Sequence, residues 1–377
     1  MDVPFVRCDI QPRLRIGRKG PAPESSVLDA GEIDEFMIHV VPTFIGERIP
    51  LIAATSRALR RLITDRLPPP IRLPTLVRGR EMPALAQRTC LGLVRLFQET
   101  PLRRYALRNE TTERYANAAA YVADRTSQIE DYRALFTRFV TLRDKVVAEL
   151  GCSKGYILDA FLRSEAFTPI GIENDPKVIR VGAKEYPHIP FVQSTATSIP
   201  LPDASVDLMY TIDTVEHLSR PREMFRECYR ILRPGGQFLI HFHPWLGPYG
   251  AHLEDIIPFP WPHVVFSMET LLATAADIYD SAAHVPAFYW FDAETGNRRP
   301  NPYRDVAYWR EFLNRMTIRE FRKVLATTSF EVEHFEQIGF SGRRFPLFRY
   351  LSGVARIPGL DELFARAAFF VVRKPSD

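Results

Sequence analysis

The chain has 377 residues and a net charge of +4, with 46% hydrophobic and 25% charged residues, as in an ordinary globular protein. It contains no run of about 18 apolar residues, which argues against a membrane-spanning helix. The first residues, "MDVPFVRCDIQPRLRIG", lack a continuous apolar segment, so we expect no signal peptide. The four cysteines form no C-x-x-C pair and are too few for a disulfide framework, so we expect a cytoplasmic protein.

The first 108 residues are the basic part of the chain, with 17 Arg and 1 Lys against 11 Asp and Glu. Their sequence predicts an amphipathic helix at 57–67 and a proline-stiffened connector at 66–74. A basic region suits contact with a membrane surface, a nucleic acid or an acidic protein, and a solvated surface is the alternative. Because no concentrated basic patch with interleaved aromatics occurs, we expect a peripheral membrane or protein contact and no nucleic acid.

The pattern of the remaining chain predicts first a helix and then alternating strands and helices. Residues 111–143 lack Pro and Gly and predict the leading helix. Strands are expected at 145–150, 168–173, 190–194, 206–213 and 237–242, with helices at 156–166, 175–186 and 222–232. A last helix is expected at 316–328, followed by strands at 330–339 and 367–375. This alternation predicts an α/β fold with right-handed crossovers and a mostly parallel sheet covered by helices on both faces.

We expect four parts along the chain. The first is the N-terminal basic, Pro-rich extension, 1–108, and the second is the core with its leading helix, 109–243. The third is an inserted aromatic and Pro-rich cap, 244–315, and the fourth is the C-terminal part of the sheet, 316–377.

The residues that follow the predicted strands are candidates for ligand binding, because an open parallel sheet binds ligands at the carboxyl ends of its strands. Gly151 and Gly155, in "ELGCSKG", would allow a tight turn and a close approach of the backbone to a ligand. Glu173 ends the second strand and can accept hydrogen bonds from the hydroxyls of a ribose. The turn lacks the spacing of G-x-G-x-x-G and of G-x-x-x-x-G-K-[ST], which argues against a dinucleotide fingerprint and a P-loop.

Four segments carry a resemblance to a known family. "VVAELGCSKG", "GIENDP", "IPLPDASVDLMYTIDTVEHL" and "ECYRILRPGGQFLI" occur in this order over about 140–245. Together they resemble the class I S-adenosylmethionine-dependent methyltransferases, in particular the branch typified by ubiquinone and menaquinone biosynthesis enzymes. The resemblance implies a Rossmann-like fold, a seven-stranded sheet whose last strand is antiparallel, and S-adenosylmethionine as the cofactor.

The resemblance also implies which residues hold the cofactor. They are Glu149, Gly151, Cys152, Ser153, Gly155, Glu173, Asn174, Thr195, Ala196 and Asp213. Glu149 would hold the methionine end, Glu173 the ribose and Thr195 the adenine side, while Asp213 would lie near the sulfonium and the acceptor. Two positions depart from the family, since Ser153 replaces a glycine and Thr195 replaces an acidic residue. Both changes could weaken cofactor binding.

The segment "HFHPWLGPYGAHLEDIIPFPWPH" (241–263) holds four of the nine histidines. His241 and His243 alternate with Phe242, so a strand would direct both imidazoles to one face. His217, which follows the fourth predicted strand, would reach the same rim of the sheet.

Three interpretations of these histidines stay open. In the first, His217, His241 or His243 is a general base or orients the acceptor, with Asp213 as a further catalytic residue. In the second, the histidines stabilise a proline-stiffened lid. In the third, a metal is bound by His241, His243, His252 and Glu254 or Asp255. We assign no metal, because a signature such as H-E-x-x-H is lacking.

The sequence therefore predicts methyl transfer to a small molecule, most readily to an oxygen of a lipid, quinone, polyketide or glycoside typical of secondary metabolism. The aromatic residues of the insertion suit an apolar acceptor pocket. The alternatives are a non-catalytic scaffold with the same fold and a nucleic-acid or protein methyltransferase. The residues "TIDT" after the fourth strand differ from the Asp/Asn-Pro-Pro-aromatic motif of enzymes that methylate DNA amino groups.

Overall fold

The computed structural model describes residues 81–102, 106, 117–282, 284, 286–287, 290–291, 297–339 and 361–376. All of them belong to the second of two units into which the chain divides, Met1–Ile33 and Asp34–Asp377. The helix predicted at 57–67 and the connector at 66–74 lie outside the described residues.

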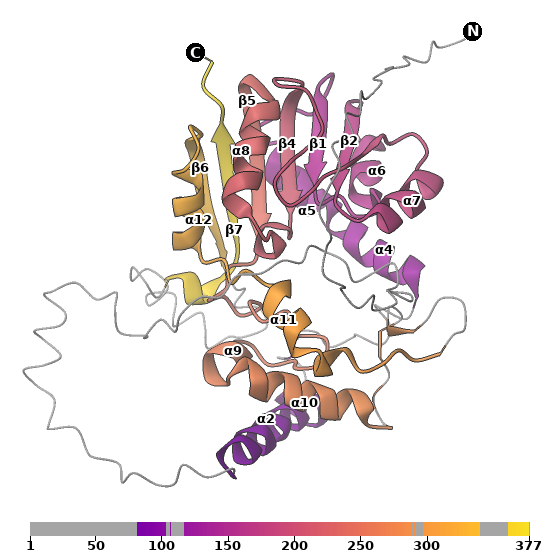
Figure 1. Ribbon diagram of the computed structural model, residues 1–377, viewed down its shortest axis with the longest axis vertical. Helices are drawn as coiled ribbons and strands as arrows, with labels where there is room; N and C mark the ends of the chain where they lie inside the picture. The colour runs from indigo at the N-terminus through magenta and orange to yellow at the C-terminus, as the bar shows by residue number, and fades with distance from the viewer. Residues whose placement is uncertain are drawn as a thin grey trace, which may run out of the picture. The chain divides into compact units, whose positions relative to one another are not determined.

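A seven-stranded sheet forms the centre of the described fold, with the strand order β3-β2-β1-β4-β5-β7-β6 (Figure 1). Its strands are β1 (Val146–Leu150), β2 (Thr168–Glu173), β3 (Phe191–Gln193), β4 (Val206–Ile212), β5 (Leu232–Phe242), β6 (Glu331–Gly339) and β7 (Ala365–Arg373). Strands β1 to β5 pair in parallel, whereas β7 is antiparallel to both β5 and β6. The predicted α/β fold with an antiparallel last strand is confirmed.

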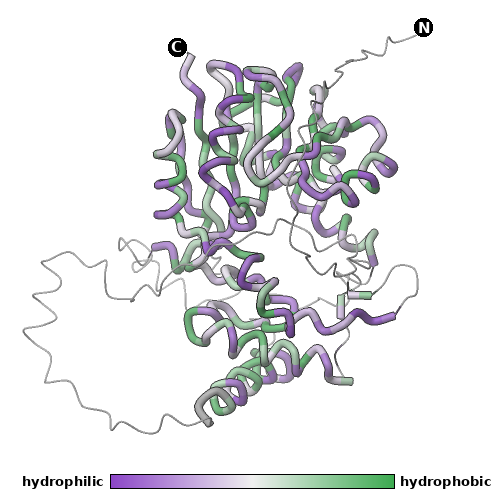
Figure 2. Tube along the Cα trace, in the orientation of Figure 1, coloured by the Kyte–Doolittle hydropathy of each residue, from purple (hydrophilic) through white to green (hydrophobic). Residues whose placement is uncertain are grey.

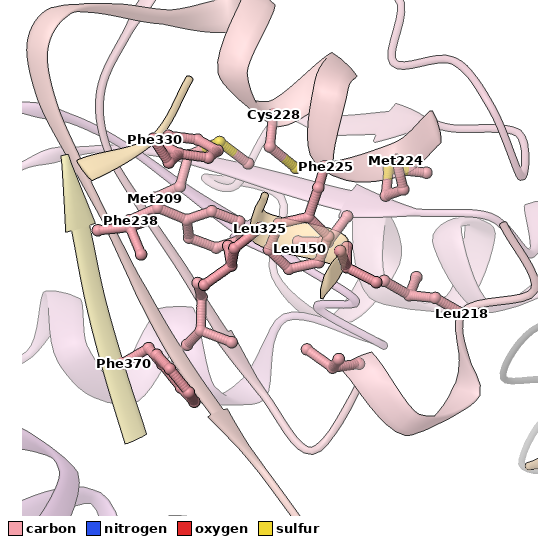
Figure 3. Close-up of a cluster of buried hydrophobic side chains, with 14 of the residues drawn as sticks. Leu150, Met209, Leu218, Met224, Phe225, Cys228, Phe238, Leu325, Phe330 and Phe370 are labelled. Atoms are coloured by element: carbon pink, nitrogen blue, oxygen red, sulfur yellow. The ribbon is translucent and has the colours of Figure 1, made fainter. Parts of the chain in front are cut away.

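Helices cover both faces of this sheet because its strands are apolar on both sides. On one face lie α8 (Pro221–Ile231) and α12 (Ile318–Leu325). Phe225 of α8 packs against Phe238 (Figure 3), and Phe321 of α12 packs against Phe370. On the other face lie α5 (Ile129–Phe136) and α6 (Tyr156–Leu162). Helix α7 (Pro176–Glu185) packs against β2 and β3. In Figure 2 the strands are mainly hydrophobic, while hydrophilic residues recur along α7 and α8.

The chain changes direction between β1 and β4, and this change determines where a ligand can bind. From β1 the chain builds β2 and β3 on one side, and it then returns to place β4 on the other side of β1. The helices that leave neighbouring strands at such a point diverge and open a crevice at the carboxyl ends of the strands.

The single helix predicted over 111–143 is wrong, because the described part forms α4 (Ala118–Ser127) and α5, which are separated at Gln128. The hydroxyl of Thr126 donates to the carbonyl oxygen of Val122 at 2.8 Å, and that of Ser127 to Asp124 at 2.6 Å. Such side-chain bonds compete with the regular backbone pattern and favour a helix end.

Residues outside the sheet form a helical cap around a third apolar cluster. Its helices are α2 (Glu81–Glu99), α9 (Pro262–Val265), α10 (Met268–Asp280) and α11 (Val306–Phe312). Cys90 and Val94 of α2 pack with Leu271 and Ala275 of α10, although about 180 residues separate the two helices in sequence. Part of the N-terminal region therefore packs with the inserted segment. Among the described helices, none has both the length and the apolar character needed to span a membrane.

Candidate active site

A cavity of about 400 Å3, part of it open to solvent, lies at the carboxyl ends of β1 and β2. The chain lines it with Leu150, Gly151, Ile172, Glu173, Asn174, Ser194, Thr195, Ala196, Thr214, Leu218, Ser219 and Met224. Of the residues predicted to bind the cofactor, Gly151, Glu173, Asn174, Thr195 and Ala196 line this cavity.

The turn after β1 brings the backbone close to β4, and glycine makes this possible. Gly151 has φ +75°, and a Cβ at this position would lie 2.3 Å from Oγ1 of Thr214. Gly155 has φ +89° and begins α6, where a Cβ would lie 2.9 Å from the ring of Phe191. Ser153, between them, has φ +51°, a left-handed conformation that costs a non-glycine residue about 1–2 kcal/mol. The backbone at position 153 therefore has the conformation that glycine, the residue of the family pattern, would adopt without this cost.

The Glu173 carboxylate organises the polar wall of the cavity. Its side chain is buried, and it accepts hydrogen bonds from the backbone N–H groups of Ser153 (3.0 Å), Asn174 (2.7 Å) and Asp175 (3.2 Å). These bonds connect the turn after β1 to the turn after β2 and fix the direction of the carboxylate.

Two polar atoms in the cavity wall lack a partner within the described parts of the chain. They are Oδ1 of Asn174 and Oγ of Ser219, both of which are shielded from solvent. A buried polar atom without a hydrogen bond costs about 1–3 kcal/mol, so a ligand that bonds to either atom would remove this cost.

Glu149 and Cys152 lie behind the cavity lining and are buried. The phenol of Tyr210 donates to Oε2 of Glu149 at 3.1 Å. Burial raises the pKa of Glu149 to about 8, and it raises the pKa of the Cys152 thiol well above its ordinary value. Glu149 is therefore largely protonated at neutral pH in the protein without ligands.

Asp213, which follows β4, is the centre of a charged cluster. Its Oδ1 lies 3.0 Å from Nδ1 of His241 and 3.4 Å from Nε2 of His243, and its Oδ2 lies 3.2 Å from Arg125 of α4. Phe242, between the two histidines, points into the opposite core. The predicted common face of His241 and His243 is therefore confirmed.

This cluster keeps Asp213 ionised. Burial opposes its ionisation, but His243, His241 and the permanent charge of Arg125 hold the pKa of Asp213 well below its ordinary value. Burial lowers the pKa of His243. Nδ1 of His243 lies 2.7 Å from the carbonyl oxygen of Arg366, which can only accept, so Nδ1 donates and the lone pair of the neutral ring is on Nε2.

A second group adjoins this cluster, in the short 3-10 helix Val215–His217 and the loop at His252. Among the described residues, Glu216, His217 and His252 form the one His/Cys/Asp/Glu group arranged to hold a metal, with ligand atoms within 4.8 Å of one another. The sequence left open a different set, in which His241 and His243 would combine with His252 and an acidic residue; in the structure His241 and His243 lie against Asp213 instead.

The aromatic residues of the insertion have separate environments. Tyr249 lies 5.6 Å from His243 between ring centres, whereas Phe259 is buried in the cap core. Trp261 donates its indole N–H to the carbonyl oxygen of Leu363 at 2.7 Å. Trp245 lines a second cavity of about 380 Å3, part of it open to solvent, together with residues of α10 and α11. Of these four aromatic rings, Tyr249 is the one in contact with the histidine cluster.

Sequence reasoning missed several residues of this region. Arg125 gave no signal, because its helix is distant from β4 in sequence. Ser219, just before α8, and Met224, in its first turns, line the cavity beyond the four segments that carried the resemblance. The burial of Glu216 also depends on the cap, since the backbone N–H of Asn314 donates to its carbonyl oxygen at 2.8 Å.

Comparison with known proteins agrees with the fold. Residues 148–240 match a family model described as a methyltransferase domain. An uncharacterized methyltransferase of Mycolicibacterium gilvum is 30% identical over 150 residues, which are 39% of this chain and 58% of that protein. A probable S-adenosylmethionine-dependent methyltransferase of Mycolicibacterium smegmatis is 36% identical over 94 residues, which cover 25% of this chain and 36% of the relative. The chain spans about half the length of the curated relatives it matches.

Among solved structures, a methyltransferase from Mesorhizobium loti is 14% identical and has a TM-score of 0.39, covering 66% of this chain and 99% of that one. The strand order and the cavity define an α/β protein of the Rossmann-like methyltransferase type. Residues 148–240 form a domain of the S-adenosylmethionine-dependent methyltransferase family. The narrower branch of ubiquinone and menaquinone enzymes stays a prediction.

S-adenosylmethionine is the cofactor of this family, and the cavity fits such a molecule. It offers the buried carboxylate of Glu173 for hydroxyl donors and the unpartnered atoms of Asn174 and Ser219 for further polar groups. At Gly151 the backbone itself forms part of the cavity wall, next to the side chain of Thr214. Ile172 and Met224 add apolar surface for a planar base.

Proposed function

We propose that this protein transfers the methyl group of S-adenosylmethionine to an oxygen of a small-molecule acceptor. One observation carries the proposal: Thr214 lines the cavity, and the preceding residue, Asp213, holds the histidine cluster. The cavity and the cluster thus meet at consecutive residues where β4 ends. The cofactor supplies a methyl group on a sulfonium, which is already electrophilic, so the protein mainly aligns the reactants and excludes water.

Six residues would hold the cofactor. Glu173 would accept hydrogen bonds from the ribose hydroxyls, and Thr195 with Ala196 would flank the base. Asn174 and Ser219 would bond to further polar groups of the ligand. Glu149, beneath the turn after β1, would provide negative charge for the cationic methionine end.

His243 is the side chain best suited to accept the acceptor's proton. Its side chain is 23% exposed, compared with 4% for His241, so an acceptor can reach it. Its Nδ1 is committed to the carbonyl oxygen of Arg366, which leaves Nε2 as the basic atom. As the acceptor oxygen bonds to the methyl carbon, its proton passes to Nε2, and the electron pair of the broken carbon–sulfur bond stays on sulfur.

His241 and Arg125 act as positioning residues in this proposal. Both contact Asp213, and the aspartate faces His243. An ionised Asp213 would stabilise the imidazolium that forms when His243 takes the proton. Asp213 has φ +52°, an uncommon backbone conformation for a residue other than glycine, and such outliers occur frequently at functional sites.

The acceptor class follows from the surroundings of His243. The ring of Tyr249 adjoins it, and the ring of Tyr132 lies 5.3 Å from that of the neighbouring His241. An apolar or aromatic acceptor that carries a hydroxyl, such as a lipid, quinone, polyketide or glycoside, matches these surroundings.

A non-catalytic scaffold is the second candidate, because of Ser153. Its positive φ without a glycine lowers the stability of the turn that would hold the cofactor. A protein that folds but does not bind S-adenosylmethionine would support this candidate. The packing of α2 on α10 supports a further proposal, that the N-terminal region adds to the cap and from there meets a membrane surface or a protein.

Methyl transfer can be tested with isotopically labelled S-adenosylmethionine and a panel of hydroxylated lipids, quinones, polyketides and glycosides. We expect labelled product with one acceptor class, and a loss of turnover of about 100-fold or more in His243→Gln without loss of cofactor binding. His334→Gln is a matched control, since His334 is similarly exposed (29%) and lies on β6. Equal loss in both variants would contradict a specific role for His243.

A further inference from the structure

Glu216, His217 and His252 form a compact group with the chemistry of a cation site. The Nε2 atom of His252 lies 3.8 Å from Oε1 of Glu216. Two ligands bound at about 2.1 Å to a tetrahedral Zn2+ lie about 3.4 Å apart, so this pair is close to a coordinating geometry. The three ligand atoms lie within 4.8 Å of one another, so a shift of less than about 1 Å in each atom would bring all three to bonding distance of one ion.

The carboxylate of Glu216 provides an independent sign that a ligand belongs here. Glu216 is 2% exposed, and its Oε2 has no hydrogen-bond partner among the described residues. Its Oε1 accepts one bond, from the backbone N–H of His243 at 3.2 Å. A buried carboxylate oxygen without a partner is costly, and a bound cation would remove that cost.

The tautomer of His217 is also suited to a metal ligand. Its Nδ1 lies 2.9 Å from the carbonyl oxygen of Phe312, so Nδ1 donates and the neutral ring has its lone pair on Nε2. Metal-binding histidines commonly have this arrangement, in which the second ring nitrogen donates to a carbonyl or carboxylate.

The cap holds the short helix that carries Glu216 and His217. The side-chain amide of Asn314 donates to the carbonyl oxygens of Val215 (2.7 Å) and Leu218 (2.8 Å). The backbone that carries Glu216 and His217 is thus held in place before any ion binds, which lowers the entropic cost of binding. His252 itself has φ +52°, a further uncommon backbone conformation within this group.

We propose that Glu216, His217 and His252 bind a divalent transition-metal cation. Two imidazoles and one carboxylate suit Zn2+, Co2+, Fe2+ or Mn2+, whereas Mg2+ and Ca2+ prefer oxygen ligands. Three protein ligands leave coordination positions open for other molecules. In one further step, which rests on the proposed function, a cation held by these residues would act as a Lewis acid and lower the pKa of an acceptor hydroxyl near His243, whose ring centre lies 6.1 Å from that of His252.

Metal binding can be measured on the full chain without cofactor or acceptor. The protein is dialysed against a chelator and then titrated with Co2+, whose visible absorption reports its ligands. We expect one Co2+ per chain, displacement by Zn2+, and no competition from Mg2+ at equal concentration. Absence of any Co2+ band in folded protein would overturn the proposal. Cofactor binding by the chelated protein tests the methyltransferase assignment separately, so the two failures are distinguishable.

Substitutions of the three candidate ligands test whether they hold the bound Co2+. Glu216→Gln and His252→Ala should each weaken Co2+ binding at least tenfold, because each removes one ligand. His188→Ala, which removes a histidine paired with Asp159 at 2.9 Å, should leave it unchanged. Equal affinity in wild type and Glu216→Gln would refute the site. If a variant fails to fold, Co2+-induced shifts of histidine resonances in the wild type decide, since His217 and His252 should shift and His188 should not.

Discussion

The affinity for S-adenosylmethionine should depend on pH through Glu149. Burial raises the pKa of this carboxyl to about 8 in the free protein, so it is mostly protonated at pH 7. If the cationic methionine end binds the ionised form, the protein must release a proton on binding. For one group with a pKa near 8, the population of the ionised form rises about ninefold between pH 6 and pH 7.

Calorimetric titration at pH 6 and pH 7 measures this linkage. We expect the dissociation constant to fall about ninefold over this interval, with about one proton released per cofactor bound in buffers of different ionisation heat. The α-amino group of the ligand titrates near pH 8, above this range. Glu149→Gln keeps an acceptor for the Tyr210 hydroxyl and should abolish the dependence. The reasoning is refuted if wild type and variant show the same pH dependence.

Three further predictions concern the same region. Gly151→Ala should weaken cofactor binding or destabilise the fold by about 2–4 kcal/mol, because the new Cβ would clash with Thr214 and a φ of +75° disfavours alanine. Calorimetry and thermal melting measure these effects, and a variant with the cofactor affinity and Tm of the wild type would contradict the prediction. Glu173→Ala should weaken binding of S-adenosylmethionine by roughly 1–3 kcal/mol, and equal affinity would show that Glu173 does not contact the ribose. Asp213→Asn should lower kcat and move the acidic limb of the pH–rate profile to lower pH while sparing KM, since the negative charge that faces the base His243 is lost; a change in KM alone would speak against this role.

The carboxyl group of Glu149 should also influence the stability of the protein without cofactor. Its pKa is near 4.5 in the unfolded chain and is raised to about 8 in the folded one. Between these values the folded state binds more protons than the unfolded state, so the free energy of unfolding falls as pH rises from 5 to 8. Glu149→Gln should therefore raise the Tm more at pH 8 than at pH 5, and equal shifts at both pH values would contradict this.

The sheet could be predicted because its signals are local. β2 occupies the predicted residues 168–173, since its apolar run lies between a helical segment and the turn residues Asn174 and Asp175. α8 begins at Pro221, a favoured first helical residue, close to the predicted start. Glu173 and Gly151 could be identified because they directly follow such strands.

The cap and the side-chain clusters of the site could not be predicted, because they depend on contacts between segments that are distant in sequence. α2 and α10 cover each other's apolar faces, and neither has a partner nearby in sequence that would reveal its role. The pairing of Arg125 with Asp213 joins a helix to a strand end 88 positions away. Glu216 and His252 likewise meet through the fold of the insertion. No periodicity or motif encodes such pairs, so the separation of the histidines into two groups required the structure.

Calorimetric titration of the chelator-treated full chain with S-adenosylmethionine and S-adenosylhomocysteine tests the central claim most directly. The cavity at the ends of β1 and β2, with its buried Glu173 and the unpartnered atoms of Asn174 and Ser219, predicts binding of one ligand per chain in the micromolar range. Glu173→Ala should weaken that binding. A folded protein that binds neither ligand would contradict the methyltransferase proposal and favour the scaffold, with the positive φ of Ser153 as its structural cause.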